Sequence, residues 1–190
     1  GLENGCHASI DEIFIDFVSP PHDFLGVGDN PAIFVNSHTY KLLGHAHETW
    51  KENKTIAVKE HFLQRSTIDI IGILVHETGH AFNIAAKIPN TETNAYIFEI
   101  EVLARWYQTK DDLLYDCTKS SLQSYLEDRL PFYRKNSKDS DCLATLIDKI
   151  ERRTLLKQIE AAPDTAREED MHPVSITTSC ATLGFFSHSG

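Results

Sequence analysis

The stretch that decides the fold is TIDIIGILVHETGHAFNIAAK, residues 67–87. Its apolar residues fall on nearly every side of a helix, and a helix that is apolar all round lies inside a protein. Ser66 predicts the start of the helix, with Asp69 three residues later in a spacing like that of a capping box. Pro89 predicts its end. We therefore expect a central helix to which the rest of the domain is attached.

Within this stretch, VHETGH (residues 75–80) places two histidines four residues apart. Residues i and i+4 lie on one face of a helix, so His76 and His80 can both direct an imidazole nitrogen at one cation. Zinc accepts such ligands in a tetrahedral site that leaves a position for water. Glu77 lies about 100° round the helix from His76, within reach of that water, where a carboxylate can act as a general base. The residues therefore predict a Zn2+ site with its own base.

A chance pair of histidines on a helix is the simpler alternative. Here, however, the motif lies in the most apolar helix of the chain, where two imidazoles and a carboxylate without partners would be costly to bury. A bound metal removes that cost, and we therefore favour the metal. Gly79 lies between the two histidines, where its lack of a side chain lets another segment approach the helix.

The motif resembles that of the zincin metallopeptidases, and the resemblance covers about residues 66–106. It implies a zincin-like α+β fold, with a small N-terminal sheet followed by a helical region that carries the zinc-binding helix. It also implies a zinc-dependent endopeptidase in which His76 and His80 bind zinc and Glu77 is the catalytic base. An extended protein substrate would pair with an edge strand of the sheet. The longer metzincin pattern is not met, because Asn83 stands where that pattern has glycine.

The third zinc ligand is expected to be a glutamate, because no aspartate follows His80 before residue 111. A symmetric helical hairpin places Glu99 opposite His80, and the HExxH-x18-E spacing resembles that of the gluzincins, so Glu99 is favoured. Glu92 stays open because it fits the local Glu-x-x-small-polar pattern of gluzincin ligand helices. Its place at the start of a helix argues against it. Glu101 is expected to form a solvent-exposed ion pair with Arg105.

The remainder of the chain predicts one domain over residues 1–162 and a loosely ordered tail over 163–190, which is rich in Ser and Thr. Strands are expected at 10–18, 32–36 and 55–63. Besides the central helix, helices are expected at about 90–109, at 111–130 with a stop at Pro131, and at 140–162 with a stop at Pro163.

Composition limits the partners and the compartment. The 190 residues are 41% hydrophobic and carry a formal net charge of −10, which argues against nucleic acid and anionic membranes as partners. No membrane span and no signal peptide are visible. No CxxC occurs, which favours reduced thiols in a reducing cytosol. We also expect the protein to be soluble and monomeric. The cysteines are Cys6, Cys117, Cys142 and Cys180.

A compact zincin without a visible leader resembles bacterial effector proteases that are delivered into host cytosol. That resemblance implies a host protein as substrate, with actin as one candidate. Two other functions stay open: a zinc-binding regulatory or interaction module without catalysis, and an all-helical interaction module in which VHETGH is accidental.

Further side chains are minor candidates for the site. His45 and His47 would share one side of a strand, and His61 lies just before the central helix. A zinc peptidase also needs a donor that stabilises the oxyanion. The candidates for that donor are Tyr96, Tyr107, Tyr115, Tyr125, Tyr133 and His172.

Overall fold

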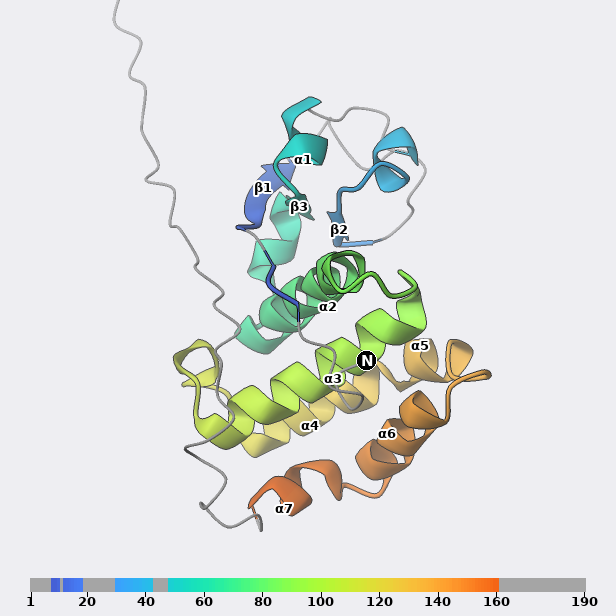
Figure 1. The fold of residues 1–190 in the computed structure, drawn as a ribbon. Coiled ribbons are helices and arrows are strands. Elements are labelled where there is room, and N and C mark those ends of the chain that lie inside the picture. The colour runs from blue at the N-terminus through green and yellow to red at the C-terminus, as the bar shows by residue number, and fades with distance from the viewer. Residues whose placement is uncertain (1–7, 11, 19–29, 43–47, 161–190) are drawn as a thin grey trace, which may run out of the picture.

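The computed structural model describes residues 8–10, 12–18, 30–42 and 48–160 (Figure 1). Its three-stranded sheet has the order β1-β3-β2. Strand β1 (Phe14–Val18) is parallel to β3 (Thr55–Lys59), and β2 (Ala32–Phe34) is antiparallel to β3 with Phe34 opposite Ile56. The 3-10 helix η2 (Thr39–Leu42) and the short helix α1 (Glu48–Glu52) connect β2 to β3. β2 is therefore an edge strand of the sheet.

Each face of the sheet packs on a different neighbour. Side chains alternate between the two faces of a strand, and one set surrounds Trp50 of α1: Val18, Ile33, Val35 and Ala57. The other set faces the central helix and packs with Ile73 and Ala81: Ala32, Phe34, Ile56 and Val58. All five residues of β3 are buried, as expected for a strand covered on both faces.

The central helix α2 (Thr67–Ala85) lies between the sheet and helix α3 (Glu92–Thr109), as Figure 1 shows. The hydroxyl of Ser66 accepts a hydrogen bond from the Asp69 backbone N–H, so the predicted cap is confirmed. Burial on both sides explains why the sequence of α2 is apolar all round. Thr91 caps α3 by accepting from the Asn94 backbone N–H.

Gly79 sets the contact between α2 and α3. A Cβ at Gly79 would lie 3.1 Å from the Cα of Ala95, so the two helices meet backbone to backbone at this point. The prediction that Gly79 admits a neighbouring segment is confirmed. As a consequence, the histidines of α2 lie beside the first turn of α3.

The C-terminal helices differ from the predicted pair. The region expected to be a single helix over 111–130 contains the 3-10 helix η4 (Asp112–Leu114) and helix α4 (Lys119–Asp128). Pro131 lies in the first turn of α5 (Leu130–Lys135), where proline is favoured because that turn needs no N–H. The expected helix at 140–162 is divided into α6 (Asp141–Glu151) and α7 (Leu155–Glu160) by Arg153, whose φ is 55°.

The sheet is also shorter than predicted. The first strand begins at Phe14, and residues after Lys59 form the 3-10 helix η3 (Glu60–Gln64). The mixed α+β class is confirmed, and an all-helical module is excluded by the sheet. The predicted tail at 163–190 lies outside the described residues. Among the described helices, none has the length and apolar character needed to cross a membrane.

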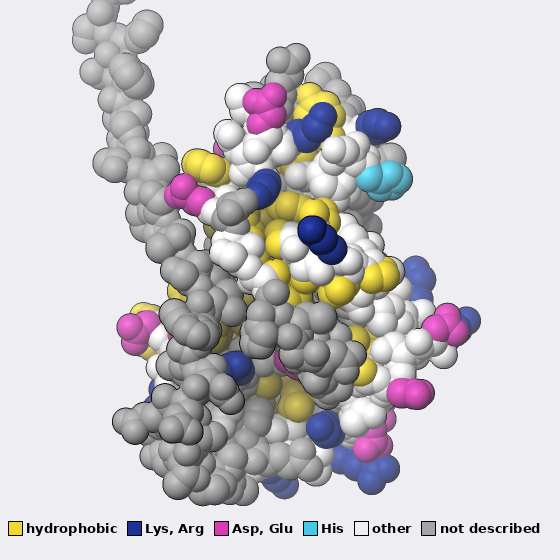
Figure 2. Space-filling model, viewed as in Figure 1, with side chains coloured by type: hydrophobic (Ala, Val, Ile, Leu, Met, Phe, Trp, Pro, Cys, Tyr) yellow, Lys and Arg dark blue, Asp and Glu magenta, His cyan; other side chains and the backbone are white. Residues whose placement is uncertain are grey.

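The main core lies among α2, α3 and the C-terminal helices, and its fully buried members include Ile100, Leu103, Leu126 and Ile150. On the face drawn in Figure 2, hydrophobic side chains gather across the middle of the molecule, where the sheet meets α2. The sheet and the helical layer therefore share α2 as their common support.

Replacement of Gly72 tests the packing between α2 and α4. A Cβ at Gly72 would overlap the hydroxyl group of Tyr125, whose side chain is buried. We expect Gly72→Ala to lower the free energy of unfolding by about 1–3 kcal/mol, since overpacking outweighs the gain in helix propensity. Denaturant unfolding measures the change, with Gln108→Ala on the exposed surface of α3 as the control. Equal stability of the two variants would contradict this packing.

Candidate metal centre and cleft

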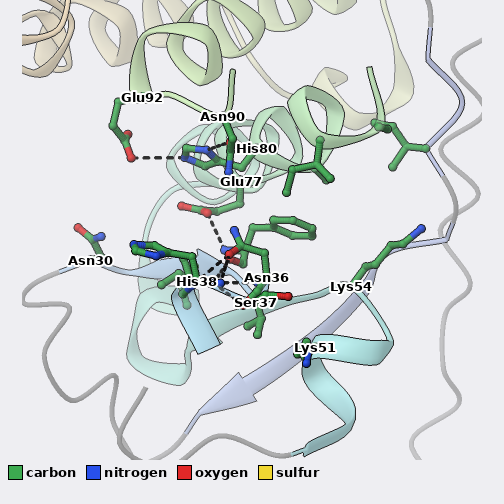
Figure 3. Close-up of a pocket in the computed structure, with 18 of the residues that line it drawn as sticks. Asn30, Asn36, Ser37, His38, Lys51, Lys54, Glu77, His80, Asn90 and Glu92 are labelled. Atoms are coloured by element: carbon green, nitrogen blue, oxygen red, sulfur yellow. Dashed lines mark hydrogen bonds and ion pairs between the residues drawn. The ribbon is translucent and has the colours of Figure 1, made fainter. Parts of the chain in front are cut away.

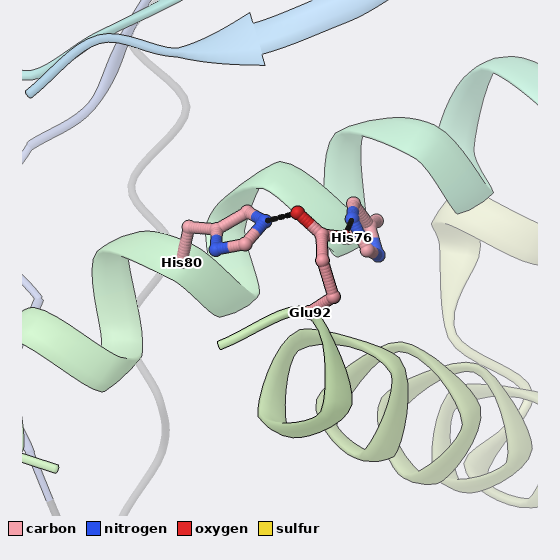
Figure 4. A group of neighbouring side chains, drawn as sticks. All are labelled: His76, His80 and Glu92. Carbon is pink, nitrogen blue, oxygen red and sulfur yellow. Dashed lines mark ion pairs between the residues drawn. The ribbon is translucent and has the colours of Figure 1, made fainter. Parts of the chain in front are cut away.

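Two histidines of α2 and one glutamate of α3 direct their side chains at a common point (Figure 4). The Nε2 atom of His76 lies 3.3 Å from one carboxylate oxygen of Glu92, and Nε2 of His80 lies 3.5 Å from the other. One candidate ligand atom from each residue lies within 4.8 Å of the other two. His76 is buried and Glu92 is half exposed, so the group is both fixed and reachable. It could hold a metal ion.

The second nitrogen of each imidazole ring is also held. Nδ1 of His76 lies 3.0 Å from Glu99 Oε2, and Nδ1 of His80 lies 2.8 Å from Asn90 Oδ1. An acceptor at Nδ1 favours the tautomer that carries its proton there, which leaves the lone pair of Nε2 for a metal. Glu99 and Asn90 thus orient the two candidate ligands.

The structure places Glu99 away from the common point, although the sequence favoured it as the third ligand. Its side chain is completely buried, on the Nδ1 side of His76. The argument that a symmetric helical hairpin places Glu99 opposite His80 fails because Gly79 of α2 packs on Ala95 of α3. This contact brings His80 beside the first turn of α3. Glu92 therefore occupies the position that the sequence assigned to Glu99. Glu101, expected on the surface, is half-buried.

The buried carboxylate of Glu99 accepts hydrogen bonds from three further side chains. The hydroxyls of Tyr125 and Tyr133 each donate to it at 2.8 Å, and Nη2 of Arg129 donates to it at 3.0 Å. Burial alone would raise the pKa of Glu99, but Arg129 and His76 lower it. Burial and the nearby charge of Glu99 raise the pKa of both tyrosines well above the ordinary value. Glu99 is therefore ionised, and the tyrosines are neutral donors.

The charges at the centre are strongly coupled. Burial lowers the pKa of His76, but the carboxylates of Glu92 and Glu99 outweigh it and raise that pKa to about 9. The hydrogen bonds from His76 and His80 lower the pKa of Glu92. A metal ion that binds here competes with the proton on His76, because a ligand imidazole must be neutral.

Glu77, the neighbour of His76 in α2, directs its carboxylate toward the sheet. Its Oε2 atom accepts a hydrogen bond of 2.7 Å from the backbone N–H of Phe34. Phe34 and Ile56 form a pair without ladder hydrogen bonds, so this N–H points outward from the edge of β2. Burial raises the pKa of Glu77, while His76 and His80 oppose that rise.

A cavity of about 1020 Å³ lies between the sheet and the helices (Figure 3). Three groups of the centre line it on the helix side, namely Glu77, His80 and Glu92. The polar residues of its sheet side come from the region of β2, η2 and α1: Asn30, Asn36, Ser37, His38, Thr39, Lys51 and Lys54. The candidate metal centre therefore opens into a large cleft with polar walls.

The outer edge of β2 is occupied at its C-terminal end. The Thr39 hydroxyl donates to the Phe34 carbonyl at 2.9 Å and accepts from the Asn36 N–H at 2.8 Å. Since Glu77 holds the Phe34 N–H, residues 34–36 have no outward backbone group left for an added strand. The expected pairing of a substrate with this edge has no support at these residues.

The predicted oxyanion donors that fall within the described residues do not line the cleft. Tyr125 and Tyr133 bind Glu99, and the ring of Tyr96 packs 4.7 Å from that of His76. Tyr107 packs against the main core, and Tyr115 is exposed after η4. His45, His47 and His172 lie outside the described residues, and His61 is exposed on η3.

The sequence analysis did not identify several residues that line the cleft or contact the candidate metal centre. His38, Lys51 and Lys54 line the cleft but lie in loops and short helices with no motif. Arg129 follows α4 and reaches Glu99 only through tertiary packing. Asn90, two residues before α3, contacts His80 from a segment that carries no motif. Of the cysteines, Cys117 and Cys142 are thiols outside any disulfide in the described region, and Cys6 and Cys180 fall outside that region.

Comparison of the chain with protein-family models, curated proteins and solved structures found no match. The site is therefore interpreted from its own residues.

Substitutions of Glu92 and Glu99 test which of the two binds the metal directly and which only orients His76. We expect Glu92→Ala to weaken metal binding by more than the roughly 10–100-fold that loss of an outer partner causes. Glu99→Gln should fall within that range and also destabilise the fold, because Arg129 loses its buried counter-charge. Metal content after dialysis and thermal unfolding measure the two effects. Asp139→Asn, on the surface, is the control.

The opposite order would contradict this assignment. A Glu99→Gln protein that is empty of metal, beside a Glu92→Ala protein that retains it, would return the ligand role to Glu99.

Proposed function

We propose that the protein is a zinc-dependent endopeptidase. The observation that carries the proposal is the position of Glu77, a buried carboxylate that lines the same cleft as His80 and Glu92 of the candidate metal group. Two imidazoles, one carboxylate and an adjacent general base are the parts that a catalytic zinc site of the HExxH type needs.

The donor atoms are spaced closely enough for one metal ion to draw them together. Ligands at about 2.0–2.2 Å from a tetrahedral zinc ion stand about 3.3–3.6 Å apart. Oε2 of Glu92 lies 3.3 Å from Nε2 of His76, Oε1 of Glu92 lies 3.5 Å from Nε2 of His80, and one ligand atom from each residue lies within 4.8 Å of the other two. Three protein ligands leave a fourth position, as in catalytic zinc sites. A bound zinc ion would polarise the scissile carbonyl and acidify a water molecule.

Glu77 would move the proton. The Phe34 N–H holds one oxygen of the Glu77 carboxylate, so the carboxylate keeps a fixed orientation while the other oxygen can accept a proton. Burial raises the pKa of Glu77, which makes it a better proton acceptor than an exposed glutamate. The same carboxyl group would then donate that proton to the departing amine.

The cleft is large enough for a peptide segment, and its size and the resemblance to zincins support a protein substrate. The resemblance to bacterial effector proteases makes a host cytosolic protein the proposed target, with actin as one candidate.

A non-catalytic zinc-binding module is the second candidate. It is favoured by the hydrogen bond from Phe34 to Glu77, because that contact gives Glu77 a structural task in tying α2 to β2. In that case zinc would stabilise the fold and a partner would bind the cleft.

Glu77→Gln distinguishes the two functions. Glutamine keeps an oxygen that can accept from the Phe34 N–H but cannot act as a base. For a peptidase we expect zinc content and melting temperature to stay unchanged, while peptide cleavage falls by at least roughly 100-fold, in line with general-base catalysis. Cleavage of a peptide library by the zinc-loaded protein is the measurement, and the surface variant Asp139→Asn is the control.

Undiminished cleavage by Glu77→Gln would refute the proposed base. If neither protein cleaves any peptide while both hold zinc, the regulatory module is the better account.

A further inference from the structure

We propose that Tyr125 and Tyr133 are positioning residues of the metal centre, which act through Glu99 to hold the imidazole of His76 in the orientation that a metal needs. Both hydroxyls donate to Glu99, so their effect on His76 is indirect. The inference rests on the metal centre of the proposed function, and it does not depend on the peptidase reaction.

The hydrogen bonds of the Glu99 carboxylate are divided between its two oxygens. Oε1 accepts the two tyrosine hydroxyls, each at 2.8 Å. Oε2 lies 3.0 Å from Nδ1 of His76 and accepts from Nη2 of Arg129 at 3.0 Å. These four contacts match the roughly four lone-pair sites of a carboxylate, and the ion pair with Arg129 spans both oxygens. Because the tyrosines hold Oε1, Oε2 is fixed in its place beside His76.

The tyrosine rings are themselves held by close packing. The hydroxyl end of Tyr125 lies against Gly72, one helical turn before His76 in α2, where a Cβ would overlap it. Tyr133 is fully buried, and the centroid of its ring lies 5.2 Å from that of Tyr96 in an edge-on contact. Tyr96 in turn packs on the imidazole of His76. Both hydroxyls are therefore delivered to the carboxylate by rings with little freedom to turn.

Loss of the hydroxyls would release one end of the Glu99 carboxylate. The last torsion of a glutamate side chain is soft, so a carboxylate that is unbound at Oε1 can rotate and take Oε2 away from Nδ1 of His76. Without that acceptor the imidazole is less restricted to the tautomer and ring orientation that direct Nε2 at a metal. A metal ion would then bind less tightly, although its three ligands are unchanged.

The tyrosines test this effect more cleanly than Arg129 does. A hydroxyl is neutral, so its removal changes the hydrogen bonds of Glu99 without changing the formal charge near a bound dication. Removal of the guanidinium would change both, and the two effects on metal affinity oppose each other, because the lost positive charge favours a cation. Phenylalanine also retains the buried ring and its packing.

Tyr125→Phe, Tyr133→Phe and the double variant test the proposal in the full-length protein. We expect the affinity for Zn2+, measured by competition with a chromogenic chelator, to fall in each single variant and to fall on the order of 10-fold in the double variant, at the lower end of the effect of an outer partner. The Nδ1–H proton of His76 in the zinc-loaded protein, followed by NMR, should exchange with water faster in the double variant than in the wild type.

Two control variants separate positioning from stability. Ile150→Val shortens a side chain that is fully buried in the same core, so it lowers the melting temperature but removes no donor to Glu99. Tyr107→Phe removes a hydroxyl elsewhere on α3. We expect both controls to keep the wild-type zinc affinity and the wild-type exchange rate at His76. Melting temperatures show that each variant is folded, and if the double variant does not fold, the single variants decide by the same measurements.

Three results would overturn the proposal. One is a folded double variant that binds zinc as tightly as the wild type or more tightly. Another is an equal loss of zinc affinity in Ile150→Val, which would make the effect one of stability. In both cases the metal centre and the peptidase function stand. If the wild-type protein binds no zinc, the metal centre fails and this inference fails with it.

Discussion

The carboxylate of Glu99 is completely buried, and it is held by side chains from three other parts of the helical layer. An ionised carboxylate without partners would be prohibitively costly at such a place. Arg129 supplies the counter-charge, and the hydroxyls of Tyr125 and Tyr133 complete its hydrogen bonds. The remaining contact goes to Nδ1 of His76. The orientation of His76, and with it the metal centre, therefore depends on how α4 and α5 pack behind α3.

A second constraint fixes the other wall of the cleft. The Phe34 N–H ties β2 to Glu77, while Thr39 closes the rest of that strand edge. The general base of the proposed reaction is thus also a contact between sheet and helix. This dual role means that loss of the Glu77 side chain affects the position of the sheet as well as the chemistry, whereas an amide in its place keeps the contact.

The sequence was sufficient for features that depend on neighbours along the chain. The cap at Ser66, the all-round apolar α2 and the i, i+4 pair of His76 and His80 are local patterns, and all are present. The preference for Glu99 over Glu92 depended on the relative level of two helices, and the structure places Glu92, and not Glu99, beside the Nε2 atoms of both histidines. That level is set by the contact of Gly79 with α3, which no periodicity reveals. Lys51 and Lys54 likewise reach the wall of the cleft only in the folded chain.

The most direct test of the metal centre is a crystal structure of the zinc-loaded protein with anomalous diffraction data at the zinc absorption edge. The account predicts one strong peak bonded to Nε2 of His76, Nε2 of His80 and the carboxylate of Glu92, with Glu99 still at Nδ1 of His76. A peak bonded to Glu99, or full zinc occupancy elsewhere with these three residues unliganded, would contradict it.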